Sequence, residues 1–157
     1  PPRSTLFPYT TLFRSSAVRR VTGEDLTNWD VHVNVVGGGR IDGPSAGAAV
    51  VLAIISALWN RPVRQNVAIT GEISIQGRVK AVGGVHEKVH GAVQAGITEV
   101  VVPKDNAMEA PELPGLKVHP VSRIEEAIDI LFPGGLSLSQ DLAPGSITPV
   151  LKRGMSS

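Results

Sequence analysis

The chain has 157 residues, of which 42% are hydrophobic and 4% aromatic, and its 15 basic and 14 acidic residues give a formal charge of +1. This length suits one domain with an aliphatic core, so the composition argues against disorder and, without a basic face, against nucleic acid as a partner. The absence of cysteine excludes a disulfide scaffold, a cysteine nucleophile and cysteine-ligated zinc, and it is typical of a cytoplasmic protein.

The two ends of the chain differ in composition from its middle. Residues 1–16 include two copies of Thr-Leu-Phe, and we expect an artefactual or flexible leader there. Residues 134–157 are rich in proline, glycine and serine, which predicts a mostly irregular tail. Residues 17–133 then form the folded domain. Its longest apolar run, Ala46 to Trp59, is shorter than the roughly 20 residues of a membrane-spanning helix, so we expect no membrane contact.

In the first half of this domain, a strand pattern is followed by a helix pattern. Val31, Val33 and Val35 alternate with polar residues, which predicts a half-buried strand. Three glycines, residues 37–39, end that strand. A helix from about Pro44 to Trp59 is apolar nearly all round, so it should lie at the centre of the fold.

The second half alternates between strands and helices. The patterns predict a strand over Val67–Thr70, a hairpin of Ile73–Ile75 and Val79–Val82, a helix over Val85–Ala95, strands over Val100–Val102 and Val118–Val121, and a last helix that begins at a capping box of Ser122 and Glu125 and ends near Phe132. The predicted class is α/β, a mixed sheet with flanking helices.

One serine stands in the first turn of the predicted central helix. It belongs to the segment Asp42-Gly43-Pro44-Ser45-Ala46-Gly47, whose small residues keep bulk away from the hydroxyl. Backbone N–H groups at a helix start favour negative charge, so the backbone around Gly43, Pro44 and Ala46 is a candidate oxyanion site. A lone serine in such a turn is more often a helix cap, so a nucleophile needs a nearby base.

Histidine is the usual base beside a serine, and the chain has four histidines. His32 falls on the polar face of the first strand, and His119 lies in the last strand. His86 and His90 fall on the polar side of the Val85–Ala95 helix when its residues are spaced at about 100°. None of these positions singles out a histidine base.

A lysine on the same helix is the anomaly. Lys88 falls within the apolar stripe of Val85, Val89 and Ala92. An amine can accept a proton only in its neutral form, which burial favours, and serine–lysine pairs are a variant of the catalytic triad. The alternative is that the lysine stem lies on apolar surface while its ammonium group stays in water.

The two motifs together match a protein family. The segments DVHVNVVGGGRIDGPSAGAAV and VAITGEISIQGRVKAVGGVHEKVHGAVQAGITEVVVPKDN resemble the proteolytic domain of bacterial Lon proteases, and the chain is most similar to the shorter B-type Lon enzymes. The resemblance implies a Lon proteolytic-domain fold and a serine endopeptidase with Ser45 as nucleophile and Lys88 as base. It further implies that Thr70 hydrogen-bonds the lysine and that Asp42 and Glu72 are acidic positions beside the site. The chain departs from many relatives at Asn34, where they carry a second histidine.

The resemblance also implies partners. Lon enzymes degrade unfolded or regulatory proteins, form homohexameric rings and carry an upstream ATPase module that binds ATP and Mg²⁺. No segment of this chain matches G-x-x-x-x-G-K-[ST], so we expect that module to be absent from it and no cofactor to bind here.

Two other interpretations remain. His86-Glu87-Lys88-Val89-His90 spells the H-E-x-x-H signature of zinc proteases, but the chain continues with Val93 and Gly96 where one group of these enzymes needs glycine and histidine. A distant third ligand, Glu109 or Glu112, would lie in a proline-rich loop. Non-proteolytic Lon-like scaffolds fused to ATPases also exist, including one in DNA repair, but they lack the paired serine and lysine.

Overall fold

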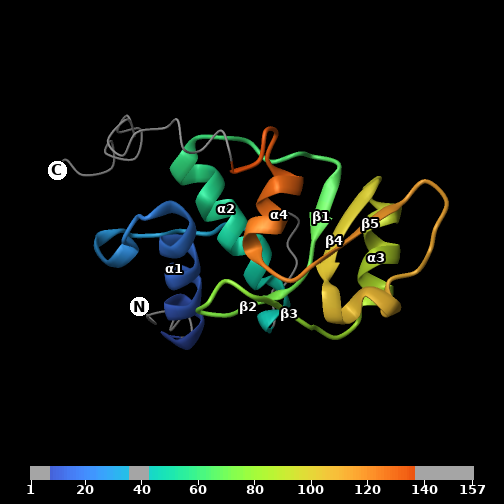
Figure 1. The fold of residues 1–157 in the computed structure, drawn as a ribbon, viewed down its shortest axis with the longest axis horizontal. Coiled ribbons are helices and arrows are strands. Elements are labelled where there is room, and N and C mark those ends of the chain that lie inside the picture. The colour runs from blue at the N-terminus through green and yellow to red at the C-terminus, as the bar shows by residue number, and fades with distance from the viewer. Residues whose placement is uncertain (1–7, 36–42, 137–157) are drawn as a thin grey trace.

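The computed structural model describes residues 8–35 and 43–136 (Figure 1). Its elements in chain order are α1 (Pro8–Thr22), η1 (Leu26–Asn28), η2 (Pro44–Ala46), α2 (Gly47–Trp59), β1 (Val67–Ile69), β2 (Glu72–Ile73), β3 (Val79–Lys80), α3 (Val85–Gln94), β4 (Glu99–Pro103), η3 (Lys104–Glu109), β5 (Lys117–Val121) and α4 (Ile124–Leu131), where η marks a 3-10 helix. Most of the predicted irregular tail, residues 137–157, lies outside the described residues.

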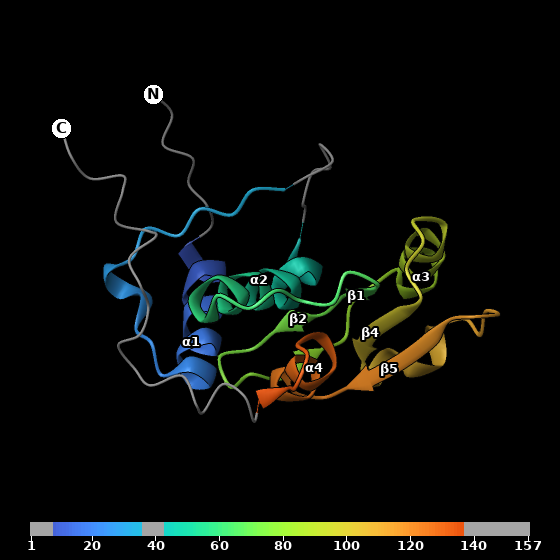
Figure 2. The ribbon, with the colours of Figure 1, turned by 90° about the horizontal axis from the view of Figure 1, so that it is seen from above.

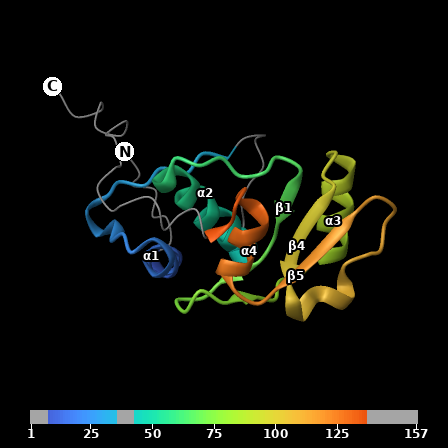
Figure 3. The ribbon, with the colours of Figure 1, turned by 45° about the horizontal axis from the view of Figure 1, so that its top comes forward.

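The strands form two small sheets. Three parallel strands lie side by side in the order β1, β4, β5 (Figure 3). The predicted hairpin is confirmed as an antiparallel pair of β2 and β3, but its strands are shorter than expected and leave Ile75 exposed. The α/β class is therefore confirmed, with parallel and antiparallel pairing divided between two sheets.

Alternate residues of β4 face two different hydrophobic clusters. Val101 packs into a large cluster with α1, α2 and α4, whereas Val100 and Val102 pack against α3. This division follows from the two-residue side-chain period of a strand. It explains why residues 100–102 read as a continuous apolar run, because both faces of the strand are buried. Figure 2 shows α3 and α4 on opposite sides of the parallel strands.

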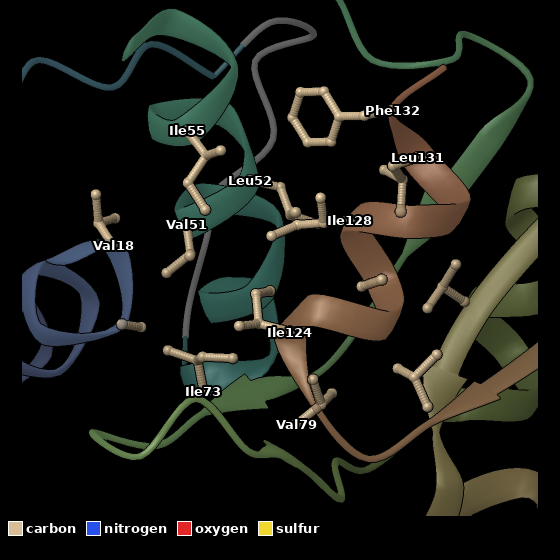
Figure 4. Close-up of a cluster of buried hydrophobic side chains, with 14 of the residues drawn as sticks. Val18, Val51, Leu52, Ile55, Ile73, Val79, Ile124, Ile128, Leu131 and Phe132 are labelled. Atoms are coloured by element: carbon tan, nitrogen blue, oxygen red, sulfur yellow. The ribbon is translucent and has the colours of Figure 1, made fainter. Parts of the chain in front are cut away.

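The large cluster is centred on α2, as its apolar sequence predicts. Figure 4 shows α2 between α1 and α4, with Val51, Leu52 and Ile55 directed into the space that they share. Leu52 and Ile55 are essentially buried. Phe132, which follows α4, closes one end of the cluster and packs edge-on against Trp59 at a centroid distance of 5.5 Å. Because α2 packs against neighbours on several sides, the position of its first turn is fixed by the core.

The predicted strand at Val31–Val35 is wrong. No strand is assigned there, and Val31, Val33 and Val35 are 43%, 48% and 41% exposed. Alternation makes a strand only when a neighbour accepts its backbone hydrogen bonds and covers one face. No described strand pairs with this segment.

Two boundaries also differ from expectation. The predicted capping box of Ser122 and Glu125 is wrong, because α4 has Arg123 at its N-cap and the Ser122 N–H donates to Glu126 Oε2 at 2.9 Å. Because the helix begins one residue later than predicted, Glu126 rather than Glu125 accepts the hydrogen bond from the backbone N–H of Ser122. At the other end, α1 begins at Pro8 and so crosses the boundary predicted after residue 16; its Ala17 and Val18 are buried.

Candidate functional site

Ser45 lies in a tight turn at the start of α2. Gly43 has φ 95° and ψ 178°, a conformation that only glycine adopts readily, and Pro44–Ala46 form a single 3-10 turn that leads into the α-helix. Ser45 is half-buried. The Gly47 N–H donates to Pro44 O and so closes the turn. Proline at the first helical position suits this geometry, because its φ is already helical and its missing N–H is not needed.

The link between β1 and β2 is hydrogen-bonded to this turn. The Gly71 N–H donates to Ser45 O at 3.0 Å, and the Ala48 N–H donates to Gly71 O at 3.0 Å. Thr70 Oγ1 also donates to Ser45 O, at 3.4 Å. A Cβ on Gly71 would lie 2.6 Å from Val79 Cγ1, so the close approach requires glycine. The end of β1 thereby fixes the backbone of the serine.

Lys88 approaches the site from the first turn of α3. Its Nζ donates to the carbonyl oxygen of Gly83, the residue before the N-cap Gly84, at 2.8 Å. The prediction that Lys88 is buried in the apolar stripe is wrong, since the residue is exposed. Val85 and Val89 do face the sheet as predicted, but Lys88 is at the edge of that stripe, where α3 borders an open cavity.

Serine, threonine and lysine meet at this cavity. Its volume is about 230 Å³, and it lies between the start of α2, β1, β4 and α3; Figure 2 shows these elements around the end of β1. The lining residues are Ser45, Ala46, Ala49, Ala68, Ile69, Thr70, Lys88, Val89, Ala92, Val100, Val101 and Val102. Apart from the three polar side chains, the lining is aliphatic. Among the described residues that line it, Lys88 is the one ionisable group.

The polar contacts in this cavity differ from those implied by the family resemblance. Within the part of the chain that the structure describes, no hydrogen bond joins Ser45 Oγ to Lys88 Nζ. The Thr70 hydroxyl, expected on the lysine, contacts the Ser45 carbonyl instead, because β1 ends beside the turn and α3 stands across the cavity. The three groups share one cavity, and each is held by a backbone carbonyl or by a turn.

The remaining predicted site positions fall around the cavity or outside the description. Asp42 lies outside the described residues. Glu72 is half-buried in β2, in register with Lys80, and is not part of the lining. Pro44 has no N–H and so contributes only shape to the turn.

The histidines lie away from the cavity lining. His86 is exposed and His90 half-buried on α3, with ring centroids 4.5 Å apart. His119 pairs with Glu99, its Nε2 2.6 Å from Glu99 Oε2. Across residues 8–35 and 43–136 there is no group of three or more histidine, aspartate or glutamate side chains placed to hold a metal ion.

Two features of the site were missed from the sequence. The Gly83 carbonyl, which accepts from Lys88, could have been suspected from the pair of glycines before the helix. The aliphatic lining from β1 and β4 could not have been predicted, because the sequence of those residues indicates only a buried strand.

In the described part of the chain, no helix is long and apolar enough to cross a membrane.

Comparison with known proteins gives a consistent answer. The chain is 40% identical to the archaeal Lon protease of Archaeoglobus fulgidus over 126 residues, which cover 77% of this chain and 20% of that protein. It is 42% identical to the Lon protease of Buchnera aphidicola over 127 residues, or 76% of this chain and 16% of the relative. It is 44% identical to Lon protease 1 of Thermus thermophilus over 110 residues, which cover 66% of this chain and 14% of that protein.

The chain thus spans a fifth or less of the length of these relatives. Archaeal and bacterial enzymes match about equally well, so the B-type subfamily stays a prediction. The family model described as the Lon protease (S16) C-terminal proteolytic domain matches residues 8–134, which include the Ser45 turn, the sheet and α3. The chain therefore belongs to the family of Lon protease C-terminal proteolytic domains.

Proposed function

We propose that this domain is a serine endopeptidase in which Ser45 is the nucleophile and Lys88 the general base. The observation that carries the proposal is that Ser45, Thr70 and Lys88, from three separate segments of the chain, line one cavity. Family membership supplies the reaction class, and the cavity supplies a place for it.

In each half of the reaction Lys88 accepts a proton and then gives it up. Ser45 Oγ attacks the carbonyl carbon of the scissile peptide while the neutral Lys88 amine accepts the hydroxyl proton. The lysine then gives this proton to the leaving amine as the C–N bond breaks, and an acyl ester remains on Ser45. Water attacks the ester while the same lysine accepts its proton, and the lysine passes that proton to Ser45 Oγ as the ester C–O bond breaks, which releases the acid product and restores the serine.

For this reaction Lys88 has to turn towards Ser45 while it is uncharged. Rotation about its four-carbon stem can direct the amine lone pair towards Ser45 without any movement of α3, while one N–H of the amine stays on Gly83 O. A bound peptide would displace water from a cavity whose lining is mainly aliphatic, and loss of water favours the neutral amine. Substrate binding therefore helps to produce the active form of the base.

The same turn offers backbone donors for the oxyanion. The N–H groups of Gly47 and Ala48 are used within the fold, by Pro44 O and Gly71 O respectively. The N–H groups of Ser45 and Ala46, two residues earlier and beside the hydroxyl, are the better placed candidates.

The properties of the whole protein follow from its relatives and are also proposals. Because the chain matches part of much longer Lon proteases, we propose that it works beside an ATPase module that binds ATP and Mg²⁺, as one subunit of a homohexameric ring. Its substrates would be unfolded or regulatory proteins in the cytoplasm, which its cysteine-free composition suits.

Substitution of the base tests the proposal most directly. Lys88→Arg keeps charge and approximate length but cannot accept the proton, so we expect cleavage of a fluorogenic peptide to fall by about 10³-fold or more. Ser45→Ala should be equally inactive and the double variant no worse, because the two groups act as a unit. Lys80→Arg, an exposed lysine on β3 outside the lining, is the matched control and should cleave normally.

The result also separates the enzyme from a non-proteolytic scaffold. A scaffold would show no cleavage in any variant, including the unaltered chain. Normal cleavage by Lys88→Arg would show that another group is the base.

A further inference from the structure

Asn106 is an unusual residue in this fold. Of the side chains in the described residues, it is the one buried polar group, 2% exposed, and it comes from η3 rather than from the cavity lining. Burying an amide is unfavourable unless its donors and acceptor are all satisfied. Asn106 therefore has to be explained by its partners.

Those partners are the backbone of one residue and a nearby carboxylate. Asn106 Oδ1 accepts from the Val82 N–H at 2.9 Å, and Nδ2 donates to Val82 O at 3.0 Å. Nδ2 also donates to Glu109 Oε1, at 2.8 Å. The amide thus binds both backbone groups of Val82, as a neighbouring strand would, although β3 has already ended at Lys80.

Val82 stands immediately before the atoms that hold Lys88. Gly83 O accepts from Lys88 Nζ at 2.8 Å, and Gly84 O accepts from the Lys88 N–H at 3.1 Å. Gly84, with φ 68°, is the N-cap of α3 and makes no side-chain capping bond. Two consecutive glycines are the most freely moving backbone that a chain can contain. Without the anchor at Val82, little would fix the direction of the Gly83 carbonyl.

We propose that Asn106 is a positioning residue for Lys88, acting through the backbone of Val82 and Gly83; this inference rests on the proposed role of Lys88 as base. With Gly83 O held in place, it accepts from one N–H of the amine and limits where the nitrogen lone pair can point. Among its orientations, those directed into the cavity towards Ser45 are then favoured. A base held by a third group is the arrangement that serine peptidases require.

The test compares Asn106→Asp with Glu109→Ala. Asn106→Asp keeps shape and the acceptor for Val82 N–H but turns a carboxylate oxygen towards Val82 O, so it breaks the anchor. Glu109→Ala removes only the outer hydrogen bond and is the matched control. If the buried charge prevents folding, Asn106→Ala removes both hydrogen bonds to Val82, and the one to Glu109, without introducing a charge. Each variant of the full chain is studied by amide hydrogen exchange and by peptide cleavage over a range of substrate concentrations, which separates kcat from KM.

We expect both Asn106 variants, and not Glu109→Ala, to exchange faster over residues 82–88 while α4 exchanges as before. We expect kcat to fall about tenfold or more with KM nearly unchanged. A purely structural asparagine would lower the melting temperature but leave the kcat of the folded protein where it was.

Unchanged exchange over residues 82–88, or an unchanged kcat, would overturn the positioning role. Lys88→Arg, measured alongside, keeps the two proposals separate. If Lys88→Arg is inactive while the Asn106 variants keep a normal kcat, the positioning role alone fails. If Lys88→Arg is active, the proposed base itself fails.

Discussion

At the scale of single residues, the place of Ser45 depends on backbone geometry more than on side-chain contacts. Its carbonyl accepts from Gly71 and Thr70, and its turn is closed by Gly47. Gly43 has the least replaceable conformation in this turn, because φ 95° with ψ 178° is nearly confined to glycine.

Gly43→Ala tests that dependence. A Cβ here would meet no atom within 4 Å, so any effect comes from backbone strain, which should cost about 1–3 kcal/mol or shift the turn. We expect a lower free energy of unfolding, a lower kcat, or both, measured by urea unfolding and peptide cleavage. Gly91→Ala is the control, since Gly91 is exposed inside α3 with open space around it and should gain about 0.5–1 kcal/mol. Equal behaviour of the two variants would contradict the strain argument.

At the scale of elements, the sequence predicted what strong local patterns determine. The central helix α2, the buried strand β4 and the amphipathic helix α3 were each expected from apolar spacing and are confirmed. The strand predicted at Val31–Val35 was wrong because a strand depends on a neighbouring strand that periodicity cannot reveal. The predicted burial of Lys88 was wrong for a related reason. A helical wheel shows which side of a helix faces the sheet but not where the sheet stops covering that side.

Helix α3 also bears on the zinc-protease alternative. His86 and His90 share one surface of the helix, whereas Lys88, Val89 and Ala92 line the cavity. We therefore expect a zinc chelator such as 1,10-phenanthroline to leave ATP-independent peptide cleavage unchanged, and His90→Ala to remain active. Cleavage that is lost with the chelator and restored by Zn²⁺ would instead support a metal-dependent mechanism.

At the scale of the whole molecule, one ionic network connects the parallel strands to the end of α4. Arg64, in the segment before β1, forms an ion pair with Glu99 of β4, and His119 of β5 lies 2.6 Å from the same carboxylate. The backbone N–H of Arg64 also donates to the backbone carbonyl of Leu131 at 2.8 Å. Hydrogen bonds from Arg64, and then from His119, lower the pKa of Glu99 from 4.5 to about 2.

This lowered pKa predicts how stability should depend on pH. A carboxylate whose pKa is lower in the folded state stabilises the fold above its unfolded pKa, and the contribution disappears as pH falls through the folded value. The window for Glu99 therefore runs from 4.5 down to about 2. We expect Glu99→Gln to lower the free energy of urea unfolding at about pH 7 and the difference from the unaltered chain to shrink towards about pH 2. Glu112→Gln, in the exposed loop before β5, is the control and should follow the unaltered chain throughout. A Glu99→Gln deficit of the same size at both ends of the window would mean that the ionised carboxylate is not what stabilises this junction.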